Sequence, residues 1–277
     1  MTEAIKSLKK DGVAMMPYSP ELRAAVEAAA SAWQDFCELP IEEKMQFTDL
    51  GPMVGYEFKD NHEPYGDRKE NFDITGSLPA ELLGMSDSHN FMLHAAEISQ
   101  AMSALAIDFA RQAEDEYHVT GLTDRTSAST HQIFTRFLHY FGDRTIGEEI
   151  ATPHCDQSGF TFHLFETGPG CQRLNYQTRQ WVDMPVESGK MAAFPAMQLQ
   201  LLSGGELPAL SHRVIATEET KDIGRFAIVC FVRLAHTPEY DKSKHGRLQE
   251  FEPGFNYGMS QKEFGQLFTT DAPLGKA

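Results

Sequence analysis

Residues 153–166 read Pro-His-Cys-Asp-Gln-Ser-Gly-Phe-Thr-Phe-His-Leu-Phe-Glu, and this stretch decides the fold. It begins with His154 and Asp156, two positions apart, and continues after a glycine as the apolar run Phe160–Glu166. Residues i and i+2 of a β-strand point to the same face of the sheet. The pattern therefore predicts a β-rich region in which both side chains can reach one ion.

Short β-rich runs separated by Gly, Pro and Asp dominate the chain after Gly121. The predicted runs are Gln132–Phe141, Phe160–Glu166, Gln180–Met184, Met191–Phe194, His212–Ala216 and Arg225–Leu234. Strands at this spacing are typical of a sandwich or a double-sheet barrel. We therefore expect a β-barrel core in this part of the chain.

Helical patterns flank this core. Ser19 and Pro20 supply an N-cap and a first-turn proline, and apolar residues then recur at helical spacing from Glu21 to Cys37. A second amphipathic pattern runs from about Phe91 to Tyr117, and Gln261–Phe268 predicts a short helix. The expected fold is α+β. It is one domain over 1–277, with a helical N-terminal region at 1–120, the barrel core at 121–240 and a C-terminal helical segment at 241–277.

Composition argues against several classes of partner. The 277 residues carry 24 Lys+Arg against 40 Asp+Glu, a formal charge of −16, without a basic stripe of the kind that tracks phosphates. We therefore expect no nucleic-acid partner. No stretch approaches the roughly 20 apolar residues that cross a bilayer, so we expect no membrane partner. The four cysteines are scattered without a C-x-x-C pair, which favours free thiols and a cytoplasmic protein.

A third candidate ligand, His212, lies at the start of a separate β-rich run and can join His154 and Asp156 around an ion. Two imidazoles and one carboxylate leave three coordination positions open, which is the ligand set of non-haem Fe(II) oxygenases. The same ligand types suit Zn²⁺, although the sequence offers no carboxylate base for zinc-dependent hydrolysis. The remaining alternative is a solvated surface turn without a metal.

Two further β-rich runs carry polar groups toward the same region. Arg225 opens the run Phe226–Val232, and the planar fork of arginine suits a carboxylate. Alternation along a second strand puts Arg136, Leu138 and Tyr140 on one face. If that face points inward, an arginine and a phenol enter the pocket. The alternative for Arg225 is an ordinary salt bridge at the edge of the barrel.

Four separate stretches match one family in the right order, from about residue 10 to 270. They are Trp33–Lys44, similar to F-x-L-P-x-E-E-K; Lys69–Ile74, similar to K-E-x-F-D-I; Pro153–Thr161, similar to H-x-D-x-G-x-x-T; and Met197–Gly205 with Ser211–Val214, similar to L-Q-x-x-T-N-G…H-R-V. The chain therefore resembles the isopenicillin N synthase-like branch of the Fe(II)/2-oxoglutarate-dependent oxygenases. The resemblance implies a double-stranded β-helix, or jelly roll, as the barrel core.

The resemblance also implies roles for individual residues. It makes His154, Asp156 and His212 the ligands of Fe(II). It makes Arg225 and Tyr140 the residues that bind the distal carboxylate of the co-substrate 2-oxoglutarate. O₂ would be the second co-substrate.

Candidate substrate contacts are less sharply defined. Arg136 shares a strand face with Tyr140, and the aromatics Tyr56 and Phe72 belong to a Gly-, Asp-, Asn- and Pro-rich segment, 50–76, that reads as a long loop or a pair of short strands. These residues indicate a small, partly apolar substrate that carries a carboxylate. His163, in an apolar run, is expected to be a hydrogen-bonded structural residue rather than a ligand.

The expected function is oxidation of a C–H bond of a small molecule, by hydroxylation, desaturation or ring closure, with release of succinate and CO₂. One departure from the family pattern bears on it, because R-x-S in the family is Arg225-Phe226-Ala227 here. The missing hydroxyl leaves open an iron oxidase that uses no 2-oxoglutarate. A non-catalytic ligand-binding protein on the same barrel is the other alternative. The sequence predicts no oligomeric state.

Overall fold

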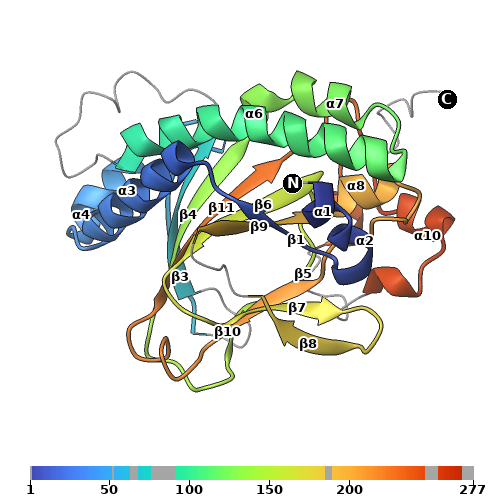
Figure 1. Cartoon of the computed structure of the whole chain (residues 1–277). Helices are drawn as coiled ribbons and strands as arrows, with labels where there is room; N and C mark the ends of the chain where they lie inside the picture. The colour runs from blue at the N-terminus through green and yellow to red at the C-terminus, as the bar shows by residue number, and fades with distance from the viewer. Residues whose placement is uncertain are drawn as a thin grey trace.

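The computed structural model describes residues 2–51, 53–62, 68–75, 91–184, 189–246 and 255–269. Within them, two antiparallel sheets have the strand orders β1-β9-β6-β11-β4-β3-β2 and β5-β10-β7-β8. The two sheets face each other, which confirms the predicted α+β fold with a jelly-roll core (Figure 1). The strands are β1 Ala14–Pro17, β2 Gly55–Asp60, β3 Arg68–Thr75, β4 Phe134–Tyr140, β5 Glu149–His154, β6 Phe160–Glu166, β7 Cys171–Asn175, β8 Gln180–Asp183, β9 Lys190–Pro195, β10 His212–Ile215 and β11 Arg225–Val232.

Helices cover the outer face of the larger sheet, with α3 and α6 lying across it (Figure 1). The predicted start of α3 is confirmed, because Ser19 accepts a hydrogen bond from the Leu22 amide at 3.2 Å and Pro20 is the first helical residue. No helix in the described ranges has the length and apolarity of a membrane span. The helices are α1 Thr2–Ile5, α2 Ser7–Asp11, α3 Pro20–Cys37, α4 Ile41–Lys44, α6 Phe91–Tyr117, α7 Leu122–Ala128, α8 Met197–Leu202, α9 Lys242–His245 and α10 Gln261–Gly265, with 3-10 turns η1 Met45–Phe47, η3 Thr130–Gln132 and η5 Phe255–Tyr257.

An aromatic cluster fixes these helices to the sheet. The ring of Phe91 in α6 lies 5.3 Å from Trp33 and 5.0 Å from Phe36, both in α3. The same ring lies 5.0 Å from Phe72 in β3 and 5.4 Å from Phe137 in β4. All five side chains are fully buried. The outer face of the larger sheet is thus filled by the helices, which leaves its inner face for a cavity.

The N-terminal region also supplies three strands to the larger sheet, and two of them, β2 and β3, fall in the segment 50–76 that the sequence predicts as a long loop or a pair of short strands. β1 pairs with β9, and β3 pairs with β4 from Lys69↔Tyr140 to Thr75↔Phe134. The strand β7 was not predicted. Only Cys171 and Leu174 are buried along it, so the strand lacks the alternating apolar pattern that marks a strand.

A buried polar network joins two of the family-like N-terminal segments. Lys44 Nζ donates to Glu70 Oε2 at 2.6 Å and to the Cys37 carbonyl at 2.9 Å. Glu70 also accepts from the Tyr56 hydroxyl at 2.6 Å and lies 2.8 Å from His139 Nδ1. A buried carboxylate is tolerated when it is paired and hydrogen-bonded in this way. The network therefore anchors α4 to the outer strands of the larger sheet.

Candidate metal centre and co-substrate pocket

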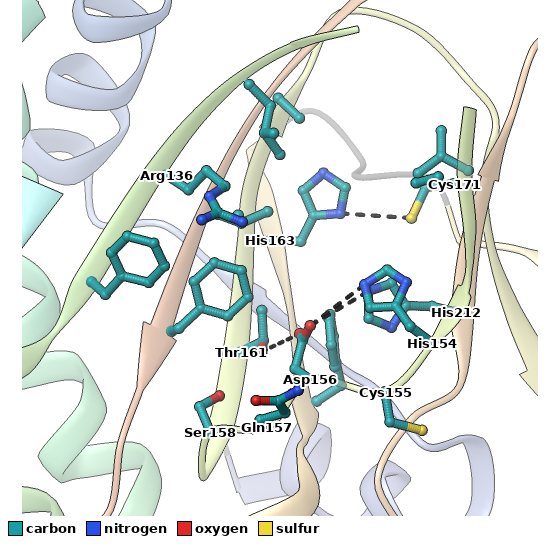
Figure 2. A pocket seen from close by; sticks show the side chains of 18 of the residues that line it. Arg136, His154, Cys155, Asp156, Gln157, Ser158, Thr161, His163, Cys171 and His212 are labelled. Carbon is teal, nitrogen blue, oxygen red and sulfur yellow. Dashed lines mark hydrogen bonds and ion pairs between the residues drawn. The ribbon is translucent and has the colours of Figure 1, made fainter. Parts of the chain in front are cut away.

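A cavity of about 490 Å³ lies between the inner faces of the two sheets. His154 ends β5 and His212 begins β10, and the two residues are cross-strand partners. Their Nε2 atoms lie 3.7 and 4.0 Å from Oδ1 of Asp156 (Figure 2). One ligand atom from each residue thus lies within 4.8 Å of the others, which suits a single ion held by all three.

Backbone carbonyls orient both imidazoles. Nδ1 of His154 is 2.7 Å from the Thr152 carbonyl, and Nδ1 of His212 is 3.1 Å from the Leu210 carbonyl. Each Nδ1 therefore carries the proton and donates it, which leaves the Nε2 lone pair facing Asp156, as metal ligation requires. Burial, with the neighbouring His212, lowers the pKa of His154 to about 4. His154 is therefore neutral at pH 7.

The turn after β5 sets the position of the carboxylate. The H-x-D spacing predicts both ligands on one strand, but β5 ends at His154 and Asp156 lies beyond it. The turn is fixed at its far side, where the Met197 amide donates to the Asp156 carbonyl at 2.9 Å. Cys155, between the two ligands, points away from them toward the Ala209 carbonyl (Figure 2). A Cβ at residue 159 would collide with the Leu234 side chain, so the turn needs Gly159.

Arg225 and Tyr140 lie together at one end of the cavity, as partners on β11 and β4. Gly224, directly before β11, lets the backbone of β11 begin close to Tyr140. It has a φ of +80°, and a Cβ at this position would collide with the Tyr140 carbonyl oxygen. Arg225 is 1% exposed. Its Nε donates to the Gly168 carbonyl at 3.0 Å, and its Nη2 pairs with Glu166. Arg225 thus makes the salt bridge that the sequence left open as an alternative, with Glu166 as the partner.

Arg136 lines the same cavity, as predicted, but its guanidinium already binds a carboxylate of the protein. Its Nε and Nη2 bind the two oxygens of Asp73 at 2.8 and 2.7 Å. The guanidinium lies over the rings of Phe134 and Phe231, 5.0 and 5.9 Å from their centres. Two of its five N–H donors are thus used within the protein.

The prediction of Tyr56 and Phe72 as substrate contacts is wrong, because neither lines the cavity. Phe72 is 0% exposed and packs on Phe91, and the Tyr56 hydroxyl donates to Glu70. Alternation along β3 explains this. It turns Phe72 and Glu70 toward the helices and Lys69 toward the cavity.

Sequence reasoning missed four polar residues of this site. Thr161 Oγ1 donates to Asp156 Oδ2 at 2.6 Å, and His163, Glu166 and Cys171 cluster beside Arg225. The period of two in the run 160–166 places Thr161 and His163 on one face and could have found both. Glu166 and Cys171 carry no such signal.

The segment that matches a known family contains all of these groups. Residues 132–234 match the profile of the 2OG-Fe(II) oxygenase superfamily. This segment, which includes the strands that carry the candidate site, is thus similar to that superfamily. A 2-oxoglutarate-dependent dioxygenase from Didymella fabae is 30% identical over 82 residues, which are 30% of this chain and only 24% of that relative.

Solved structures share the oxygenase fold over most of the chain. A putative oxygenase from Shewanella oneidensis has a TM-score of 0.69 at 25% identity, covering 84% of this chain and 86% of that one. A full-length Neurospora crassa protein in complex with alpha-KG and thymine has a TM-score of 0.68 at 17% identity, covering 96% and 89%. Oxygenases of this superfamily are enzymes that use Fe(II), 2-oxoglutarate (alpha-KG) and O₂. The residues present fit these groups, since two imidazoles and a carboxylate converge in a cavity that a buried arginine also lines.

Proposed function

We propose that this chain, as one oxygenase domain over residues 1–277, oxidises a C–H bond of a small molecule with O₂ and 2-oxoglutarate. The reaction would release succinate and CO₂. One observation carries the proposal: His154, Asp156 and His212 approach within 4.8 Å in the same cavity that Arg225 and Tyr140 line. A metal centre and an anion site within one cavity are what this chemistry needs.

Different residues of the cavity would bind the metal ion and the co-substrate. His154, Asp156 and His212 would hold Fe(II) through Nε2, Oδ1 and Nε2 respectively. Arg225 and Tyr140 would bind the distal carboxylate of the co-substrate, which fixes its other end toward the metal ligands. When bound, the iron and its co-substrates supply the oxidising power. The two sheets exclude water from the reacting groups.

The wall near Arg136 supports a small, partly apolar substrate. Phe134 and Phe231 stack there with ring centres 5.2 Å apart and an angle of 23°. The Neurospora crassa structures with thymine and 5-formyluracil support a small molecule as the substrate class. A substrate carboxylate, which the sequence suggests, would have to share Arg136 with Asp73.

Two finer assignments belong to the same proposal. The isopenicillin N synthase-like branch is supported by the Lys44–Glu70 pair, which connects two of the segments that resemble it. A cytoplasmic location is supported by the four free cysteines Cys37, Cys155, Cys171 and Cys230.

The test is an anaerobic titration of the protein with Fe(II) and then 2-oxoglutarate, followed by the weak visible charge-transfer band of the chelate. The wild type should give the band, and Asp156→Ala should bind neither iron nor co-substrate tightly. Arg225→Ala should keep its iron and bind 2-oxoglutarate roughly 100-fold more weakly, because it loses charge-assisted hydrogen bonds. Arg233→Ala, which removes a charge from the same cavity at the other end of β11, should bind 2-oxoglutarate as the wild type does.

A second function has one specific observation in its favour. Ala227 offers no hydroxyl, and Glu166 already pairs with Arg225, which together favour an iron oxidase that uses no 2-oxoglutarate. In that case iron would bind without the band, and O₂ would be consumed without succinate. Ligand binding without any O₂ consumption would instead support a non-catalytic protein.

A further inference from the structure

A buried polar cluster lies beside Arg225 and has no role in the function proposed above. It consists of His163 on β6, Glu166 at the end of β6 and Cys171 at the start of β7. His163, Cys171 and Arg225 line the cavity, as Figure 2 shows for the first two. Glu166 Oε2 pairs with Arg225 Nη2 and lies 3.5 Å from His163 Nε2. Arg225 and His163 therefore both contact the same carboxylate oxygen of Glu166.

His163 Nε2 makes no hydrogen bond in the described part of the chain, because its 3.5 Å contact with Glu166 Oε2 does not have hydrogen-bond geometry. The residue is 4% exposed, and its Nε2 is buried without a hydrogen-bond partner. An unsatisfied buried donor costs free energy, so such an atom in a cavity wall calls for an explanation. A ligand group that accepts its hydrogen bond provides one.

Two neighbouring groups favour a proton on His163 Nε2: the Glu166 carboxylate, 3.5 Å from Nε2, and the Cys171 thiol near Nδ1. Cys171 Sγ is 3.8 Å from His163 Nδ1. Burial raises the pKa of Cys171 to about 12, so it is a protonated thiol that can donate to Nδ1. Burial also lowers the pKa of His163 to about 4, so the imidazole is neutral at pH 7. Nδ1 is then the acceptor, and Nε2–H is a donor.

The cluster suits an anion better than a second metal ion. His163, Glu166 and Cys171 have the spacing of metal ligands. However, the Glu166 carboxylate is already paired with the fully buried guanidinium of Arg225, which leaves it less available to a metal ion. The protonated thiol is also a poor ligand. Among the described residues, the hydrogen bonds of Arg225 use its Nε and Nη2, and none uses Nη1.

We propose that His163 donates a hydrogen bond from Nε2 to the distal carboxylate of 2-oxoglutarate, alongside Arg225, and that Cys171 helps to fix the required tautomer. On β11 the cavity-lining neighbours of Arg225 are Ala227 and Val229, which have no donor. Val229 is the register partner of His163, so the imidazole reaches the cavity beside this apolar stretch. The inference rests on the proposed function and names a specificity-determining residue for its co-substrate.

The test compares two co-substrates in four proteins. Wild type, His163→Ala, Ala227→Ser and the double variant are loaded with Fe(II) anaerobically. Each is titrated with 2-oxoglutarate and with 2-oxopentanoate, which has a methyl group in place of the distal carboxylate. His163→Ala should weaken 2-oxoglutarate binding about tenfold and leave 2-oxopentanoate binding within twofold. Adding Ala227→Ser should restore most of the loss, because a hydroxyl then faces the same carboxylate from β11.

Equal losses for both ligands, or no loss for either, would overturn the proposal and make His163 a structural residue. Failure of the serine to restore binding would also count against it. If His163→Ala does not fold, His163→Leu removes the donor at similar volume, and His163→Gln keeps an N–H donor and should bind 2-oxoglutarate better than the leucine variant. A wild type that binds iron but neither 2-oxo acid overturns the proposed function itself, and so differs from every outcome that concerns His163 alone.

Discussion

The two carboxylate oxygens of Asp156 have different surroundings. Oδ2 accepts the hydroxyl of Thr161 at 2.6 Å, whereas Oδ1 faces the Nε2 atoms of His154 and His212. Thr161 therefore holds the carboxylate in the orientation that directs Oδ1 to the ion. Loss of a hydrogen-bond partner of a metal ligand typically weakens metal binding by about 10- to 100-fold. We expect Thr161→Val, which keeps the shape and removes the hydroxyl, to weaken Fe(II) binding by that factor in a metal titration.

The same substitution elsewhere in the larger sheet provides the control. Thr135 is as buried as Thr161, and its hydroxyl contacts Cys230 Sγ at 3.1 Å, away from the ligands. Thr135→Val should lower stability somewhat and leave Fe(II) affinity unchanged. Equal iron affinities in the two variants would show that the Thr161 hydroxyl does not orient Asp156.

At the scale of elements, the network around Glu70 connects α4 to β2, β3 and β4. Burial raises the pKa of this carboxyl, but hydrogen bonds from His139, Lys44 and Tyr56 outweigh burial and lower it to about 2. An unfolded chain has an ordinary glutamate pKa of about 4.3. Between these values the unfolded state binds more protons than the folded state, so lowering the pH favours unfolding. The contribution of Glu70 to stability is therefore complete above about pH 4.5 and is lost as the pH falls toward 2.

Urea unfolding between pH 6 and 3 tests this contribution. Glu70→Gln should be less stable than the wild type at pH 6, and its stability should fall less steeply below pH 4.5. Glu57→Gln, an exposed carboxyl on the adjacent β2, should follow the wild-type curve. A Glu70→Gln curve parallel to that of the wild type would mean that other carboxyls determine the acid sensitivity.

Elements with their own periodicity were predictable, and contacts between elements were not. The N-cap at Ser19 and the apolar run of β6 carry local patterns, so α3 and β6 were found at their observed starts. The pairing of Glu166 with Arg225 depends on a register shift between β6 and β11 after Ile228, which no local pattern reveals. Phe72 looked like a loop aromatic because its partner Phe91 is distant in the sequence.

The same contrast between local sequence patterns and contacts between elements holds for the site residues. His154, Asp156 and His212 were singled out because their residue types suit a metal ion and because the stretches around them resemble those of the oxygenase family. Cys171 was missed, because a lone cysteine in a strand with two buried positions gives no sign that its thiol lies near His163. Contacts that form only when the two sheets pack together, such as that of Cys171 with His163, leave no pattern in the sequence.

For the molecule as a whole, the proposed metal centre would connect the two sheets. His154 and His212 belong to the smaller sheet, and Asp156 lies in the turn that enters β6 of the larger sheet. An ion held by all three residues would tie the sheets together in the folded state and would find no preformed site in the unfolded chain. Bound at 100 times its Kd, it should stabilise the protein by about 2.7 kcal/mol. For a chain of this size we expect Tm to rise by roughly 5 to 10 °C.

Thermal unfolding measures this rise in Tm. Chelator-treated protein is compared under anaerobic conditions with and without Fe(II) or the redox-stable Mn²⁺. The wild type should gain the full shift and lose it again on adding a chelator. Asp156→Ala should gain nothing, because its two remaining ligands both lie in the smaller sheet and cannot tie it to the larger one. His62→Ala, which removes an exposed histidine, controls for metal bound at the surface and should behave as the wild type. A shift of similar size in Asp156→Ala would place the stabilising ion outside the triad, since the bridge between the sheets depends on that carboxylate.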